Sequence, residues 1–183
     1  MPKTNINFMK KIIKEYPADA EELLPLVDTE GNVIGKALRS ECHRNKKLIH
    51  PVVHVHVYDN QGRIFLQKRS KNKKIQPNKW DTSVGGHIAF GENIETALSR
   101  EAWEEAGIVN GVFEMITKYL WQSDVETEMV YVYKCLYLKP KIIAIGEIDD
   151  GRFWLKSEIF DNIGKNVFTP MFEQEFVKIE KYI

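Results

Sequence analysis

Apolar and polar residues alternate along much of the first half of the chain, a pattern typical of strands. Residues 51–58, PVVHVHVY, place valine and histidine at alternate positions, which predicts a strand with one buried face. The turn DNQG separates this segment from RIFLQKR, so residues 51–69 predict a hairpin. The earlier segment LLPLVDTEGNVIGKALR predicts another hairpin, with its turn at residues 30–32.

The second half of the chain predicts further strands and two helices. Residues 111–122 and 126–138 are rich in apolar side chains. In the second of these stretches both faces are apolar, which predicts a central strand covered on both sides. The segment GRFWL predicts a short strand, and residues 169–182 predict a C-terminal helix. Together with a helix inside residues 85–108, these elements predict an α/β fold, an α/β/α sandwich with a mixed β-sheet.

Length and composition narrow the class of protein without identifying its function. The chain has 183 residues and equal numbers of basic and acidic side chains, 26 of each. We therefore expect an arm or short helix at residues 1–22, one domain at residues 23–183, and no global field that favours nucleic acid or an anionic membrane. The two cysteines, Cys42 and Cys135, form no CxxC pair, which is typical of a reducing compartment. With no secretory signal or membrane span in the sequence, we expect a soluble, cytoplasmic monomer or homodimer.

The helix within GGHIAFGENIETALSREAWEEAGI, residues 85–108, carries charges in an unfavourable place. At about 100° per residue, Glu101, Glu104 and Glu105 share one face, and the same face begins with apolar residues. The ordinary interpretation is a solvated helix end, but clustered negative charge at a helix C-terminus opposes the macrodipole. A divalent cation removes this conflict, because three hard oxygen ligands on one face suit Mg²⁺ or Mn²⁺.

The spacing of these residues resembles the Nudix box, which has the pattern GX5EX7REUXEEXGU. The match begins at Gly86, continues through Glu92 and Arg100, and ends at Ile108, with agreement at every fixed position. The flanking strands and the segment GRFWLKSEI also resemble Nudix domains, so the resemblance covers about residues 23–182. It therefore implies both the fold and the class of activity, which is metal-dependent hydrolysis of a diphosphate.

The resemblance also implies a role for each residue of the box. The implied metal ligands are the Gly86 carbonyl and the carboxylates of Glu101, Glu104 and Glu105. Arg100 would orient Glu101, and Glu92 would buttress the loop or bind an ion through water. The general base stays open between Glu101 itself and a loop carboxylate. Glu147 lies where relatives place such a group, although it is equally interpreted as one acid of a solvated turn.

The residues upstream of the box resemble the branch of Nudix proteins related to isopentenyl-diphosphate isomerase. Three histidines match the metal site of the isomerase: His43, His50 and His87. They predict either a second site for Zn²⁺ or Mn²⁺ or, for His87, a contact with substrate phosphate, and a structural hydrogen-bonded role is the remaining interpretation. His54 and His56 are interpreted as structural.

The same upstream segment contains two positively charged side chains that resemble those of the isomerase, but it lacks a cysteine that the isomerase needs. Arg69 and Lys73 match the residues that bind the diphosphate there, or are solvated loop charges. The isomerase needs a cysteine just before the histidine that matches His87, and this chain has TSVGGH at that place. We therefore expect a hydrolase that acts on a small nucleoside or other organic diphosphate, with no nucleic-acid or membrane partner. An isomerase and a non-catalytic ligand-binding module are the alternatives.

Overall fold

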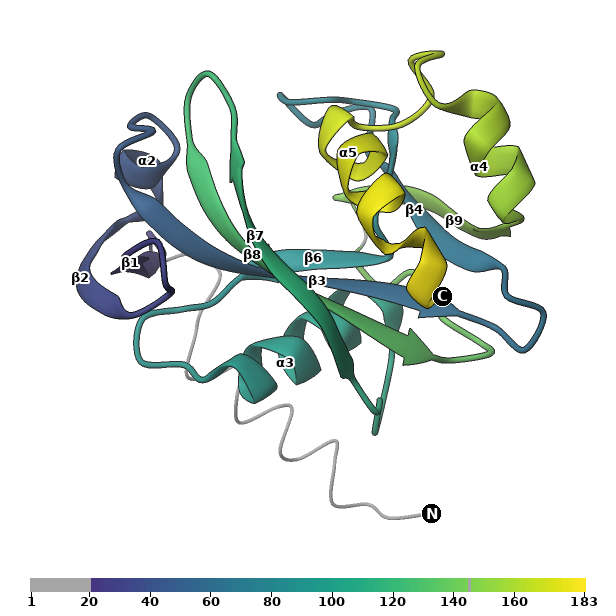
Figure 1. Ribbon diagram of the computed structural model, residues 1–183, viewed down its shortest axis with the longest axis horizontal. Helices are drawn as coiled ribbons and strands as arrows, with labels where there is room; N and C mark the ends of the chain where they lie inside the picture. The colour runs from purple at the N-terminus through teal and green to yellow at the C-terminus, as the bar shows by residue number, and fades with distance from the viewer. Residues whose placement is uncertain (1–20, 145) are drawn as a thin grey trace. The chain divides into compact units, whose positions relative to one another are not determined.

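The computed structural model describes residues 21–144 and 146–183, so the predicted arm at residues 1–22 lies almost wholly outside the described residues. In chain order the elements are β1 (Leu23–Val27), β2 (Val33–Leu38), α2 (Arg39–Cys42), β3 (Ile49–Tyr58), β4 (Ile64–Arg69), β5 (Trp80–Asp81), β6 (Val84–His87), α3 (Ile94–Ala106), β7 (Glu114–Gln122), β8 (Thr127–Leu136), β9 (Ile148–Trp154), α4 (Lys156–Asn162), α5 (Pro170–Ile179) and the 3₁₀ turn η1 (Glu180–Tyr182) (Figure 1). The protein is α/β, as predicted from the sequence.

The strands form two sheets. β1 and β2 make a two-stranded sheet, and the larger sheet has the order β5-β4-β3-β8-β7, with β6 paired to β3 and β9 paired to β4. Backbone packing divides the chain into two compact units. Unit 1 holds the described residues up to Val53 with Gly86–Arg100 and Lys118–Tyr131, and unit 2 holds His54–Gly85, Glu101–Thr117 and Val132–Ile183. Among the described residues, no helix is both long and apolar enough to cross a membrane.

The hairpin of unit 1 forms where the sequence predicts it. β1 and β2 pair antiparallel from Leu23 opposite Leu38. Gly31 in the turn has φ of +91°, a conformation that is costly for residues with a side chain. The Asp28 carboxylate accepts the backbone N–H groups of Glu30 and Asn32 at 2.9 and 2.8 Å, which satisfies the turn internally.

Unit 2 is built around an aromatic core between strands and helices. β4 pairs antiparallel with β9, as Phe65 opposite Phe153 illustrates. Residues of β4, β9, α4 and α5, with Phe168 from the segment before α5, form this core: Ile64, Leu66, Trp154, Ile159, Phe168, Phe172 and Phe176. Helix α5 begins at Pro170, and Thr169 before it caps the helix by accepting the N–H of Phe172 at 3.2 Å. The predicted strand at GRFWL and the predicted C-terminal helix are confirmed.

Three features differ from the sequence-based expectations. β3 is buried at every position except its two ends, so the expected single buried face is wrong. Its polar side chains are histidines, which can be buried when they are neutral or hydrogen-bonded. Helix α2 was not predicted, because four residues are too few to show periodicity. Helix α4 was also missed: its N-terminus is held by the Glu158 carboxylate, which accepts the N–H of Leu155 at 2.8 Å.

The core of unit 2 gives a stability prediction. Replacing the buried Phe172 with alanine should lower the free energy of unfolding by about 3–5 kcal/mol, because a large cavity remains where the ring packed. The matched control on the same helix is Val177→Ala, since the Val177 side chain is 62% exposed. It should change the unfolding free energy by less than about 0.5 kcal/mol in urea denaturation. Equal effects of the two substitutions would contradict this assignment of the core.

Candidate functional site

The acidic end of α3 belongs to unit 2 and carries a partly buried carboxylate, that of Glu105. Glu105 Oε2 accepts the backbone N–H of Gly85 at 3.0 Å and the side-chain amide of Gln67, also at 3.0 Å. Burial raises the pKa of the Glu105 carboxyl to about 7, and these hydrogen bonds lower it only in part. The negative charges of Glu147 and Asp81 raise it further. The donors to this carboxylate are neutral, so the site has an excess of negative charge that a divalent cation fits.

The predicted phosphate-binding cations of unit 2 face carboxylates. Lys73 Nζ lies 2.7 Å from Glu147 Oε2, in a pair whose side chains are 33% and 64% exposed. Arg69 contacts Asp81 Oδ2 at 3.2 Å and donates to the carbonyl of Ile75. Asp81 and Glu147 are the acids that raise the Glu105 pKa. Each outer acid of this cluster therefore has a cation beside it, and a phosphate that binds to Arg69 or Lys73 competes with a carboxylate.

Unit 1 holds the first half of the box in a compact hydrogen-bonded arrangement. The Arg100 guanidinium makes two contacts with the Glu92 carboxylate, at 3.0 and 2.9 Å, and donates to the carbonyl of His87 at 2.9 Å. Glu92 also accepts the N–H of Ala89. A bidentate charged pair of this kind fixes the loop between β6 and α3. This is the geometry that a buttressing role of Glu92 requires, while the roles of Gly86 and Arg100 in catalysis stay predictions.

The three predicted histidines come together in unit 1. His43 follows α2, His50 lies on β3 and His87 ends β6, and their ring centroids are 5.1–5.4 Å apart. The Nε2 atoms of His43 and His87 lie 3.0 Å apart. One nitrogen from each ring falls within 4.8 Å of the other two, as the ligand atoms of a metal site do. Both ring nitrogens of His50 are buried without a hydrogen-bond partner among the described residues.

Two glutamates of unit 1 complete the histidine cluster and were missed from the sequence. Glu126 Oε2 lies 3.2 Å from His43 Nδ1, and Glu128 Oε1 lies 3.7 Å from His50 Nε2. His50, Glu126 and Glu128 also form a candidate metal-binding group. The signal in the sequence was Glu-Thr-Glu at the start of a predicted strand, where alternate residues point to one face. We call these five residues, His43, His50, His87, Glu126 and Glu128, the histidine cluster.

Burial keeps the imidazoles of the histidine cluster neutral. Desolvation lowers the pKa of His43 to about 4, and the charges of Arg39 and His50 lower it further. For His50 burial again dominates and the pKa falls to about 4, with Arg39 adding to the effect. Burial also holds the pKa of His87 well below its usual range. Neutral imidazoles carry the lone pairs that metal ligation requires, so proton competition at neutral pH is weak.

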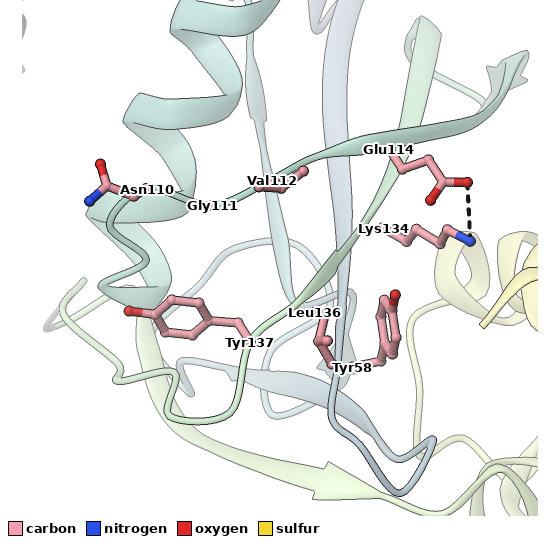
Figure 2. A pocket seen from close by; sticks show the side chains of 8 residues that line it. All are labelled: Tyr58, Asn110, Gly111, Val112, Glu114, Lys134, Leu136 and Tyr137. Atoms are coloured by element: carbon pink, nitrogen blue, oxygen red, sulfur yellow. Dashed lines mark ion pairs between the residues drawn. The ribbon is translucent and has the colours of Figure 1, made fainter.

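An imidazole in an ordinary environment has a pKa of about 6.5. Burial lowers the pKa values of His43 and His50 to about 4, so these two side chains protonate only in more acidic solution. A separate pocket of unit 2, with a volume of about 300 Å³, contains none of the predicted site residues. Figure 2 shows that pocket, where Lys134 pairs with Glu114 at 3.3 Å.

The α/β fold thus carries a partly buried carboxylate on an acidic helix and a cluster of buried or partly buried histidines. A family model for the NUDIX domain matches residues 48–170. An uncharacterized Nudix hydrolase of Streptomyces coelicolor is 37% identical over 156 residues, which are 84% of this chain and 85% of that protein. Isopentenyl-diphosphate Delta-isomerase 2 of Photorhabdus laumondii is 29% identical over 161 residues, which are 84% of this chain and 90% of the isomerase. The chain belongs to the Nudix family.

Solved structures agree on the fold. The protein DR0079 of Deinococcus radiodurans superposes with a TM-score of 0.74 at 23% identity, over 86% of this chain and 98% of DR0079. The Nudix domain of Shewanella oneidensis NrtR, solved with ADP ribose, has a TM-score of 0.56 at 17% identity, over 72% of this chain and 85% of that domain. At these identities the likeness concerns the fold alone.

The lowered pKa of His50 predicts acid-dependent stability of the metal-free protein. The folded state holds His50 neutral down to about pH 4, whereas the unfolded chain protonates it near pH 6.5. The unfolded state binds more protons between these values, so stability is full above pH 6.5 and is lost as the pH falls. His50→Leu should reduce the slope by about 1.4 kcal/mol per pH unit, measured by urea denaturation with EDTA between pH 6.5 and 4.5. An unchanged slope would contradict the burial of a neutral imidazole.

Proposed function

We propose that the protein hydrolyses a phosphoanhydride bond in a nucleoside or other organic diphosphate, with Mg²⁺ or Mn²⁺ held by the carboxylates of Glu101, Glu104 and Glu105. The observation that carries this proposal is the Glu105 carboxylate, which is partly buried, accepts hydrogen bonds from neutral donors only, and has its pKa raised by two further acids. Burying an acid in this way destabilises the fold unless a cation compensates for it. The arrangement therefore serves ligand binding rather than stability.

The other residues of the candidate site have roles that follow from their charges. When bound, the cation lowers the pKa of a coordinated water and draws negative charge from phosphate oxygens. Arg69 and Lys73 would receive the diphosphate, which displaces the carboxylates of Asp81 and Glu147 from them. Release from Lys73 would leave Glu147 with its charge uncompensated. Arg100 and Glu92 hold the loop before α3 in place through their paired side chains.

Hydrolysis is favoured over isomerisation by the residues before His87. Moving a double bond requires a group that protonates and deprotonates carbon, and this position carries Gly85 and Gly86 instead of a thiol. The two cysteines, Cys42 and Cys135, are buried and free. The relatives include proteins named isopentenyl-diphosphate isomerase, which keeps the isomerase as the second candidate. An intact set of box acids disfavours the third candidate, a non-catalytic ligand-binding module.

A second metal ion fits the histidine cluster. The donor set mixes neutral imidazole nitrogens with carboxylate oxygens, a combination that suits Zn²⁺ or Mn²⁺. The buried ring nitrogens of His50 have no hydrogen-bond partner among residues 21–144 and 146–183. Buried polar atoms that lack a partner are costly, and a metal ion would satisfy them. Ligation would therefore offset the cost of keeping these side chains inside the protein.

The first functional prediction concerns the acids of α3. Glu104→Gln and Glu105→Gln should each lower kcat at least about 100-fold with Mg²⁺, since losing even a partner of a metal ligand costs 10–100-fold. The substrate panel comprises ADP-ribose, CDP-choline, nucleoside diphosphates and isopentenyl diphosphate. The readout is the two phosphate monoesters formed from each of the first two compounds, and inorganic phosphate released from the others. The metal-free Tm of Glu104→Gln should rise slightly, because one of several like charges at the helix C-terminus is removed.

The matched control for these variants is Glu95→Gln. This exposed residue lies in the first turn of the same helix, and its substitution changes the charge by the same amount. It should keep parental activity. If Glu105→Gln keeps full activity, Glu105 is not a metal ligand. If Glu104→Gln also keeps full activity, the proposed metal site on α3 is wrong. If isopentenyl diphosphate takes up deuterium from D₂O at carbon and releases no phosphate, the protein is an isomerase and the proposed hydrolase activity is wrong.

The second functional prediction concerns the histidine cluster. Calorimetric titration with Zn²⁺ or Mn²⁺ should give nearly equal affinities for the parent at pH 7.5 and 5.5, because the pKa values of His43 and His50 lie at about 4. His50→Ala and Glu126→Gln should weaken binding at both pH values. If His50→Ala binds as tightly as the parent, the second metal site is wrong, and His87 is left with a substrate-contact role only.

A further inference from the structure

A buried triad of side chains in unit 2 lies outside the predicted site. Glu175 of α5 projects its carboxylate toward two histidines of β3. His54 Nδ1 lies 3.0 Å from Glu175 Oε2, and His56 Nε2 lies 2.6 Å from Glu175 Oε1. His56 and Glu175 are fully buried, whereas His54 keeps 8% of its surface exposed. Of the three side chains, His54 is therefore the one that solvent reaches.

The hydrogen bonds determine which nitrogen of His54 carries the proton. Burial raises the pKa of Glu175, but the charge of His54 and the hydrogen bonds from both histidines lower it to below its usual range. The carboxylate is therefore ionised and can only accept hydrogen bonds. It follows that His54 donates through Nδ1–H, and that Nε2 is the ring atom that gains or loses a proton when His54 titrates. A buried carboxylate that fixes the tautomer of a histidine is the arrangement that orients a base in hydrolytic enzymes.

The Nε2 side of His54 faces the backbone next to the partly buried acid of the candidate site. A Cβ atom added to Gly85 would lie 3.3 Å from His54 Cδ2 and 3.4 Å from His54 Nε2. The absence of a side chain at residue 85 thus lets the imidazole edge pack closely on β6. The N–H of the same glycine donates to Glu105 at 3.0 Å. A single residue consequently separates the His54 edge from the carboxylate of the proposed metal site.

We propose that His54 is the general base of the hydrolysis and that Glu175 is its positioning residue. This inference rests on the proposed function. His54 Nε2 takes one proton from the attacking water while the water oxygen forms a bond to phosphorus. The bridging P–O bond breaks, and the leaving phosphate keeps its electron pair. The imidazolium then returns the proton to solvent, so no further reactant is needed.

The other candidates for the general base, Glu147 and Glu101, have other interaction partners. Glu147 lies 2.7 Å from Lys73, and Glu101 is a proposed metal ligand whose lone pairs the cation would occupy. The titratable groups around His54 include His56 on its own strand, Glu175 on α5 and, beyond Gly85, Glu105 on α3. Glu175 stabilises the protonated form of His54 directly. Its charge therefore sets the pH below which the base is lost.

The test compares the parent with His54→Asn on the compound of the panel that the parent hydrolyses fastest. Asparagine places its amide N–H near the position of Nδ1, so the bond to Glu175 is kept while the Nε2 lone pair is removed. We expect kcat to fall about 100-fold or more, with KM within about threefold of the parental value. The acid limb of the kcat–pH profile should disappear. Thermal unfolding monitors the fold of each variant.

The matched control is His56→Gln, which keeps a donor near the Nε2 position and leaves Glu175 hydrogen-bonded. His56 is enclosed, so its substitution should change kcat by less than about threefold. A fall in kcat equal to that of His54→Asn would mean that the triad acts only through stability, and it would overturn the proposal. Parental kcat in His54→Asn would overturn it as well.

If His54→Asn does not fold, Glu175→Gln tests whether His54 is the general base. Loss of the negative charge should lower kcat and move the acid limb to lower pH, because the carboxylate no longer stabilises the imidazolium. An unmoved limb overturns the role of His54. A parent that hydrolyses no compound of the panel overturns the proposed function and this inference with it, whereas an active parent with an active His54→Asn overturns this inference alone.

Discussion

The hydrogen bonding of one partly buried carboxylate, that of Glu105 at the end of α3, is the constraint on which the arrangement of unit 2 depends. Its two hydrogen bonds come from Gly85 of β6 and Gln67 of β4, so two strands are organised around it. The acids that face it are each held by a cation, Asp81 by Arg69 and Glu147 by Lys73. The inner acid alone relies on neutral donors. The metal site that we propose would place a divalent cation beside this acid, on the helix that carries the Nudix box.

Two glutamates of the same unit, Glu105 and the fully buried Glu175, show how the hydrogen-bond partners of a carboxyl determine its pKa. Burial raises the pKa of both carboxyls. Glu105 meets an amide and a backbone N–H, and its pKa stays near 7. Glu175 meets two histidines, whose charge and hydrogen bonds reverse the effect of burial. Neutral donors stabilise an ionised carboxylate less than charge-assisted donors do. The first carboxylate is therefore suited to exchange its proton for a cation, and the second to remain ionised and orient an imidazole.

The histidine cluster of unit 1 uses burial in the opposite direction. Desolvation disfavours the charged form of an imidazole, and Arg39 beside the cluster adds to the effect. The result is a set of neutral nitrogens next to the carboxylates of Glu126 and Glu128, whose distances from the rings are 3.2 and 3.7 Å. The chain is similar both to Nudix hydrolases and to isopentenyl-diphosphate isomerases. The glycines before His87, where an isomerase needs a thiol, are the residues that separate the two chemistries.

The sequence by itself determined the elements whose residues are close together in the chain. The two hairpins, the helix of the box and the strand GRFWL follow from periodicity and turn residues, and the spacing of the box identified the acids of α3 and the family. The tertiary structure alone decided which distant residues meet. Glu175 stands 121 positions from His54, and Glu126, just before β8, reaches His43, just after α2. Helix α2 and the burial of β3 on both faces were likewise decided by packing. Local patterns report which side of an element is buried or exposed, whereas the partner of a buried polar group depends on the path of the whole chain.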